Sequence, residues 1–182
     1  MLNRLIAKLK NRRAASLAEM LIALLLCLLT FTMASTALSS GTAHLKKTTV
    51  QSESKVLLGT LIMAVEDELR FSGSRRAASG SGPEQYMFYS NSRPAGWRRL
   101  AVNDKGHLVL WYYGDDYNTP EADKQIRPLI SDSGYTQGMT ADLALNWNDT
   151  DKAFEGTIII YDTGGTELVK ESFKVEPVNV NR

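Results

Sequence analysis

The amino-acid sequence predicts an α+β protein in which one long N-terminal helix packs on an antiparallel β-sheet head. Two patterns along the 182 residues support this fold class. Apolar residues recur at helical spacing up to residue 71, whereas from residue 86 they alternate with polar residues, which is typical of strands. We therefore expect a basic segment 1–14, an apolar helix 15–38, an amphipathic helix 39–72 and a β-rich head 73–182.

Charge is distributed unevenly along the chain, whose formal net charge is +1. Residues 1–14 hold five basic side chains and no acid, which leaves residues 15–182 with 16 lysines and arginines against 20 acids, a formal charge of −4. The average composition, 43% hydrophobic and 23% charged, excludes a disordered tail and a polytopic membrane protein. A single cysteine, Cys27, excludes an internal disulfide and a zinc site built from several thiolates.

An uncharged run of 19 residues, Met20–Leu38, follows the basic segment. As a helix it would be about 28 Å long, enough to cross a bilayer core of about 30 Å. Lysines and arginines precede the run and none occurs in the next seven residues, which places the N-terminus in the cytoplasm. Two interpretations fit: a span that is kept, or an ordinary secretory signal cut near residues 35–37.

Glu19 lies at the very start of the apolar run, where a charge in lipid is costly. Residues 12–26, RRAASLAEMLIALLL, resemble the processing site of type IV prepilins and pseudopilins. In that family a prepilin peptidase removes a short basic leader before the apolar helix, and the mature chain has Glu as its fifth residue. A cut between Ala14 and Ala15 would place Glu19 fifth and Leu17 third. The sequence departs from the family's pattern in having Ala14 where Gly is commoner and Ala15 where Phe is commoner. A cut after Ala15 would leave Glu19 fourth.

The resemblance implies a function and a set of partners. Residues 1–14 would be a leader that is removed, and Ala15 would become the N-methylated terminus. Glu19 would meet the freed amine of a neighbouring subunit and set the register of packed helices. The partners would be the prepilin peptidase, an inner-membrane assembly platform and other pilin or pseudopilin subunits. The precursor would span the cytoplasmic membrane once, with its head outside, before joining a surface pilus or a pseudopilus. On the residues alone, Glu19 is also a helix N-terminal acid favoured by the macrodipole.

The helical pattern continues beyond Leu38. Gly41 predicts a kink or local unwinding, and Gly73 predicts the end of the helix just after Phe71. Apolar residues between these points lie three or four positions apart, as on one face of a helix: Val50, Leu57, Leu58, Leu61, Ile62, Val65 and Leu69. We expect the sheet to pack on the face formed by Leu58, Ile62, Val65 and Leu69. A long helix with an apolar half and an amphipathic half is a second point of resemblance to pilins.

The head is predicted to contain six strands. A flexible loop is expected at residues 72–83, and a long connection at residues 114–141. Asn103-Asp104-Lys105-Gly106 predicts a tight turn between the second and third strands. The last three strands are expected to form a meander. The strands are predicted at 86–90, 98–102, 107–113, 143–147, 154–161 and 167–175.

Catalytic motifs are lacking in the sequence. The two histidines, His44 and His107, have no cysteine or acid at ligand spacing, so both are interpreted as surface residues. No nucleophilic triad order, zinc-protease motif or phosphate-binding loop occurs. We therefore expect neither an enzyme nor a cofactor.

Two further groups of residues could bind ligands. Asp149 and Asp151, and likewise Asp115 and Asp116, offer oxygen ligands in loops, and some pseudopilins bind calcium in the head. Because no glutamate follows at a fixed offset, solvated turn acids are the favoured interpretation, with Asp149 and Asp151 as weak metal candidates.

Basic residues also alternate with aromatic ones, as in proteins that bind nucleic acid. The charge of −4 disfavours a broad basic surface and leaves only a local patch. The residues concerned are Arg93, Arg98 and Arg99, with Trp97, Tyr86 and Tyr89.

The sequence therefore favours a structural subunit of a type IV pilus or pseudopilus. The alternative function is a secreted or membrane-anchored β-rich binding domain with an ordinary signal sequence.

Overall fold

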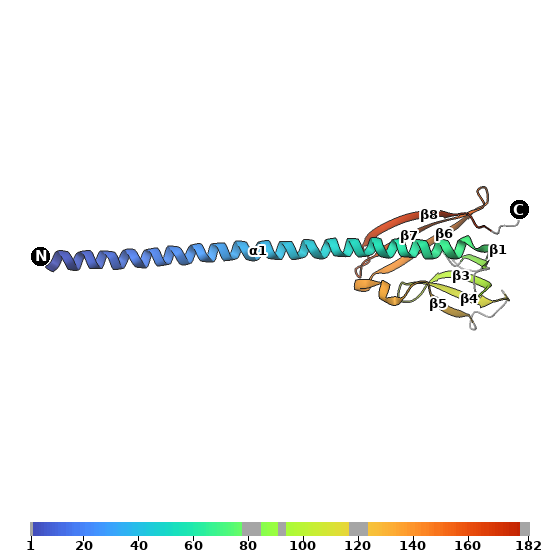
Figure 1. Ribbon diagram of the computed structural model, residues 1–182, viewed down its shortest axis with the longest axis horizontal. Helices are drawn as coiled ribbons and strands as arrows, with labels where there is room; N and C mark the ends of the chain where they lie inside the picture. Colours follow the sequence, from blue (N-terminus) through green and yellow to red (C-terminus); the bar gives the residue numbers. More distant parts are fainter. Residues whose placement is uncertain (1, 78–84, 91–93, 117–123, 179–182) are drawn as a thin grey trace. The chain divides into compact units, whose positions relative to one another are not determined.

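The computed structural model describes residues 2–77, 85–90, 94–116 and 124–178, with side chains from residue 17 onward. One helix, α1 (Leu2–Arg70), precedes every strand (Figure 1). The chain divides into two compact units, Met1–Thr48 and Thr49–Arg182. Helical structure continues through Gly41, so the local unwinding predicted there is not seen. The helix ends at Arg70, one residue before the predicted end, and a strand starts at Ser72.

In the second unit, five strands form an antiparallel sheet in simple chain order. The turn predicted at residues 103–106 is confirmed: Gly106 N–H donates to the Asn103 carbonyl over 2.9 Å, and Gly106 has a φ of 71° that suits glycine. The strands are β1 (Ser72–Ala77), β2 (Tyr86–Ser90), β3 (Gly96–Val102), β4 (Leu108–Gly114) and β5 (Gln125–Pro128).

A second antiparallel sheet is the predicted meander of β6 (Thr140–Asn148), β7 (Ala153–Tyr161) and β8 (Glu167–Val175). Its inner face is apolar because alternate residues are buried along β6, and Ile158 and Ile160 are fully buried on β7. The two sheets meet where the Ala141 N–H donates to the Gly106 carbonyl over 2.7 Å. The head thus has two sheets where a single sheet was expected.

The core lies between the helix and the inner faces of both sheets. Leu58, Val65 and Leu69 are buried and Ile62 is half-buried, so the predicted packing face is confirmed. Leu57 and Leu61 widen that face. Figure 1 shows the last turns of α1 lying along the strands. The strands and the segment before β6 supply further large side chains of this core, among them Phe88, Leu100, Leu108, Met139, Leu143, Trp147, Phe154, Ile158, Ile160 and Phe173.

Two strands were not predicted. The loop expected at 72–83 contains β1 up to Ala77, and residues 78–83 lie outside the described part. The connection expected at 114–141 contains β5, whose four residues are all exposed. Neither strand buries an apolar face, so neither leaves an alternating pattern in the sequence. Each is held by backbone pairing to a neighbouring strand.

The segment 130–139, which we call the strap, carries two short 3-10 helices, η3 (Asp132–Gly134) and η4 (Thr136–Gly138). It follows β5 and leads into β6. Its tyrosine and methionine, Tyr135 and Met139, are buried in the core.

Candidate functional site

The first candidate site is the apolar part of α1. Every residue from 17 to 49 is exposed, including the whole predicted span Met20–Leu38. Within the part of the chain that the structure describes, this is the one helix long and apolar enough to cross a membrane. Burying such side chains is worth roughly 1.5–3 kcal/mol each, so a surface of this kind requires a partner or a lipid phase.

The threonine hydroxyls in this run form hydrogen bonds within the helix itself. The hydroxyl oxygens of Thr30, Thr32 and Thr36 each donate to the carbonyl three residues earlier, over 2.8–2.9 Å. The sequence shows four polar side chains in an apolar run, Ser35 and these three threonines, and the structure gives each threonine a partner within the same helix. These threonine hydroxyls therefore need no hydrogen-bond acceptor from whatever surrounds the helix.

The predicted processing residues lie in the same helix. Ala14 and Ala15 are within the helical backbone of α1, and their side chains lie outside the described part. The Glu19 side chain is exposed.

Asp149, a weak metal candidate, is held by protein donors. It accepts a hydrogen bond from Trp147 Nε1 over 2.9 Å and one from Arg75 over 2.8 Å. These contacts hold the pKa of the Asp149 carboxyl below its usual value, with the Trp147 hydrogen bond as the larger cause. The Arg75 guanidinium also lies 3.9 Å from the centre of the Trp147 ring. Arg75, which belongs to the segment expected to be a flexible loop, therefore ties β1 to the second sheet.

Asp151, the other weak candidate, is paired with Lys174 on β8 and also accepts from Asn148 Nδ2. The pairing raises the pKa of the Lys174 ammonium, chiefly through the Asp151 hydrogen bond. Among the described residues, no group of three histidines, cysteines or acids could hold a metal ion. Both aspartates thus act as ion-pair acceptors at the β6–β7 turn.

The two described arginines of the predicted basic patch, Arg98 and Arg99, are buried. Arg98 forms an ion pair with Glu68 of the helix, and its side chain is only 4% exposed. Arg99 is likewise buried, and Arg93 lies outside the described residues. Trp97 packs edge-on against Tyr89, with ring centres 5.6 Å apart. Arg98 and Arg99 are therefore not placed to contact nucleic acid phosphates from the surface.

A cleft of about 460 Å³ lies between the strap and the helix. Val56 and Leu57 from the helix and Ile130 from the strap give it a largely apolar lining. At one end Glu53 accepts hydrogen bonds from the Thr136 hydroxyl, over 2.7 Å, and from Gln137 Nε2, over 2.9 Å. These two bonds join the strap to the helix.

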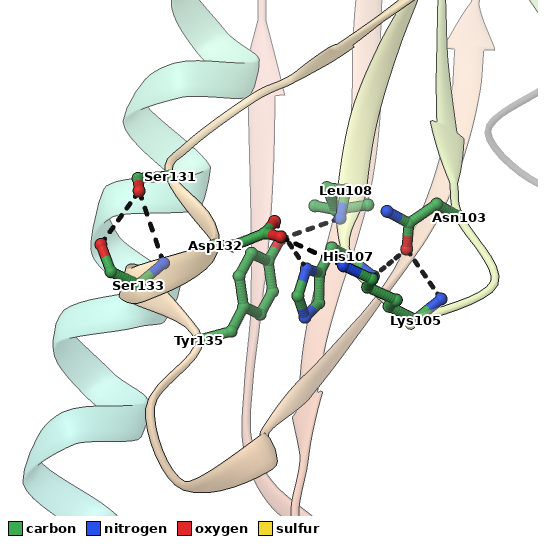
Figure 2. A network of polar contacts seen from close by, with 8 residues as sticks. All are labelled: Asn103, Lys105, His107, Leu108, Ser131, Asp132, Ser133 and Tyr135. Atoms are coloured by element: carbon green, nitrogen blue, oxygen red, sulfur yellow. Dashed lines mark hydrogen bonds and ion pairs between the residues drawn. The ribbon is translucent and has the colours of Figure 1, made fainter.

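The other side of the strap carries a polar network centred on Asp132 (Figure 2). His107 Nδ1 lies 3.1 Å from Asp132 Oδ1, and Lys105 Nζ lies 3.3 Å from Asp132 Oδ2. Both contacts lower the pKa of Asp132, the His107 hydrogen bond most strongly. His107, interpreted from the sequence as a surface residue, has a side chain that is only 14% exposed, and its acidic neighbour lies 25 positions further along the chain.

Tyr135 completes this network. Its ring stacks on the His107 ring, with centres 3.8 Å apart and planes 9° apart. The Leu108 N–H donates to its hydroxyl oxygen over 2.8 Å. Burial raises the pKa of Tyr135 to about 12. His107 is therefore enclosed by an acid, an aromatic ring and the start of β4. The other histidine, His44, contacts Thr48 in its own helix.

Comparisons with known protein families, with curated proteins and with solved structures found no match to this chain.

Proposed function

We propose that this chain is the precursor of a type IV pilus or pseudopilus subunit. A prepilin peptidase would cut between Ala14 and Ala15, and the mature chain would polymerise with like or related subunits through its N-terminal helix. The precursor would span the cytoplasmic membrane once, with residues 1–14 in the cytoplasm, and an inner-membrane assembly platform would transfer it into the fibre.

One observation carries the proposal. The apolar residues 17–38 are exposed, while the unit Thr49–Arg182 buries a core of its own. Such an apolar helix is suited to two successive environments, first lipid and then the helices of other subunits. The basic leader and Glu19 at the start of the apolar run support prepilin processing in particular.

The first experiment locates the cut. The protein is expressed with and without a prepilin peptidase, extracted from membranes and sequenced from its N-terminus. We expect a start at Ala15, carrying an N-methyl group, only when the peptidase is present. A start near Leu38 in both samples would contradict the proposal and select an ordinary signal sequence with a released β-rich domain.

The second experiment tests Glu19. A buried carboxylate needs a partner, which in the fibre would be the amine of a neighbouring subunit. We expect Glu19→Leu to remain membrane-inserted but to lower the amount recovered in sheared filaments at least tenfold. Glu19→Asp keeps the charge and is expected to retain more of the incorporation. Glu167→Leu, on the exposed edge strand β8, is the control.

If Glu19→Leu entered filaments as well as the unmodified chain, Glu19 would have no assembly role. A chain that stayed in the membrane fraction under all conditions would indicate an anchored binding module that is never polymerised.

A further inference from the structure

The strap is attached to the rest of the head at both of its sides. Glu53 of the helix holds Thr136 and Gln137, and His107 and Lys105 hold Asp132. One wall of the apolar cleft is formed by Ile130, Ser131, Ser133, Gly134 and Thr136 of the strap. A change in either attachment therefore changes how firmly that wall is held.

The His107–Asp132 contact has a defined proton arrangement. An ionised carboxylate only accepts hydrogen bonds, so Nδ1 of His107 must carry the proton that Asp132 accepts. In the neutral imidazole Nε2 then has no proton, and protonation at Nε2 makes the whole ring a cation. The same contact is thus a hydrogen bond from a neutral imidazole to the carboxylate at higher pH, and an ion pair once the imidazole is protonated.

We propose that His107 and Asp132 form a pH-responsive latch that holds the strap more firmly when the imidazole is protonated. The His107 side chain is 14% exposed and Asp132 is 61% exposed, so the contact is partly screened by water. Protonation also places a cationic ring against the face of Tyr135, which is an attractive arrangement. This inference is independent of the proposed function, because it concerns the head alone.

Among the described residues, the charged and titratable groups that face His107 are Asp132 and Tyr135 on the strap and, through Asp132, Lys105 on the turn before β4. Lys105 opposes the latch because it is a second cation on the same carboxylate. Its side chain is 70% exposed, so its repulsion of the His107 cation is well screened. The attraction of Asp132 is therefore expected to prevail.

The test measures hydrogen exchange of backbone amides in the strap, on the full chain in detergent micelles. Protection factors, corrected for the intrinsic exchange rate, are compared at about pH 5.5 and about pH 8, which bracket the ordinary titration range of histidine. We expect protection of the strap to fall about threefold at the higher pH, a size suited to a partly exposed ion pair. Amides of β7 are expected to show no such change.

Three variants identify the residues responsible. The chain has only two histidines, so His44→Gln is the matched control and should keep the pH dependence. His107→Gln keeps a donor toward Asp132 but cannot titrate, and should abolish it. Asp132→Asn keeps an acceptor without charge, and should reduce it.

Any of three results would contradict the latch. The strap could lose as much protection on raising the pH in His107→Gln as in the unmodified chain, or His44→Gln could remove the pH dependence. Protection of the strap could also be the same at both pH values in the unmodified chain. Should His107→Gln fail to fold, as judged by its near-UV circular dichroism, an NMR titration of His107 in the unmodified chain and in Asp132→Asn decides. An identical midpoint in the two proteins would then overturn the latch.

Discussion

Two halves of one helix use apolar residues in different ways. In residues 17–48 every side chain is exposed, and leucines lie all around the helix. In residues 49–70 the buried positions, such as Leu57, Leu61 and Val65, follow one another at helical spacing and form a single face. A helix that is buried on one side belongs to a domain core. A helix that is apolar all around is instead suited to an environment outside its own chain.

The largest expected effect tests this difference directly with one substitution in each half. Leu61 is fully buried, so Leu61→Ala should lower the free energy of unfolding of the head by about 3 kcal/mol through lost burial and a cavity. Leu25 is 62% exposed, so Leu25→Ala should leave that free energy unchanged. Urea denaturation in detergent, followed by tryptophan fluorescence, measures both.

A destabilisation of the head by Leu25→Ala comparable to that of Leu61→Ala would contradict this difference between the two parts of the helix. It would mean that the first half of the helix packs on the head in solution.

A smaller loss of stability is expected from a substitution at Gly156 in the second sheet, where an added side chain has no room. A Cβ atom on Gly156 of β7 would overlap the ring of Phe173 on β8. Gly156→Ala should therefore cost about 1–3 kcal/mol of head stability through overpacking. The double variant Gly156→Ala/Phe173→Leu should recover part of that loss, which the same denaturation experiment would show. An additive or greater loss would show that the Phe173 ring is not the obstacle.

The smallest effect is a dependence of the stability of the head on pH, which comes from Tyr135. The folded pKa of Tyr135, about 12, lies above the ordinary tyrosine value of 10.0. Its contribution to stability is therefore complete below pH 10 and is lost as pH rises from 10 to 12, because the unfolded chain ionises first. Tyr135→Phe should remove that part of the decline, as measured by thermal unfolding at a series of pH values. An equal decline in Tyr135→Phe would assign the loss to other groups.

Much of the fold was predictable from local patterns. The strands ending at Ser90, Val102 and Val175 were predicted to within two residues at both ends, because the spacing of apolar residues is a local signal. The helix face that carries the core was predictable for the same reason. What could not be predicted was structure without a local signal. The strand β1 has no apolar alternation and is fixed by β2 and by the Arg75–Asp149 contact.

The side-chain polar contacts could not be predicted from the sequence, for a related reason. His107 and Asp132 are 25 positions apart, and Arg98 and Glu68 are 30 apart. Spacing along the chain says nothing about pairs that only the tertiary fold brings together. The arginines near Trp97 illustrate the opposite error, since an alternation of basic and aromatic residues on a strand can place the charge inside the protein.

The threonine hydroxyls of the apolar helix have a consequence for any change of environment. Thr30, Thr32 and Thr36 each keep a hydrogen-bond partner within the same helix, whatever surrounds it. When lipid is exchanged for the side chains of another subunit, these groups break no bond and need no new one. Under the proposed function, moving the helix between the two environments then depends on apolar contact area and on Glu19, which makes Glu19 the group most sensitive to the exchange.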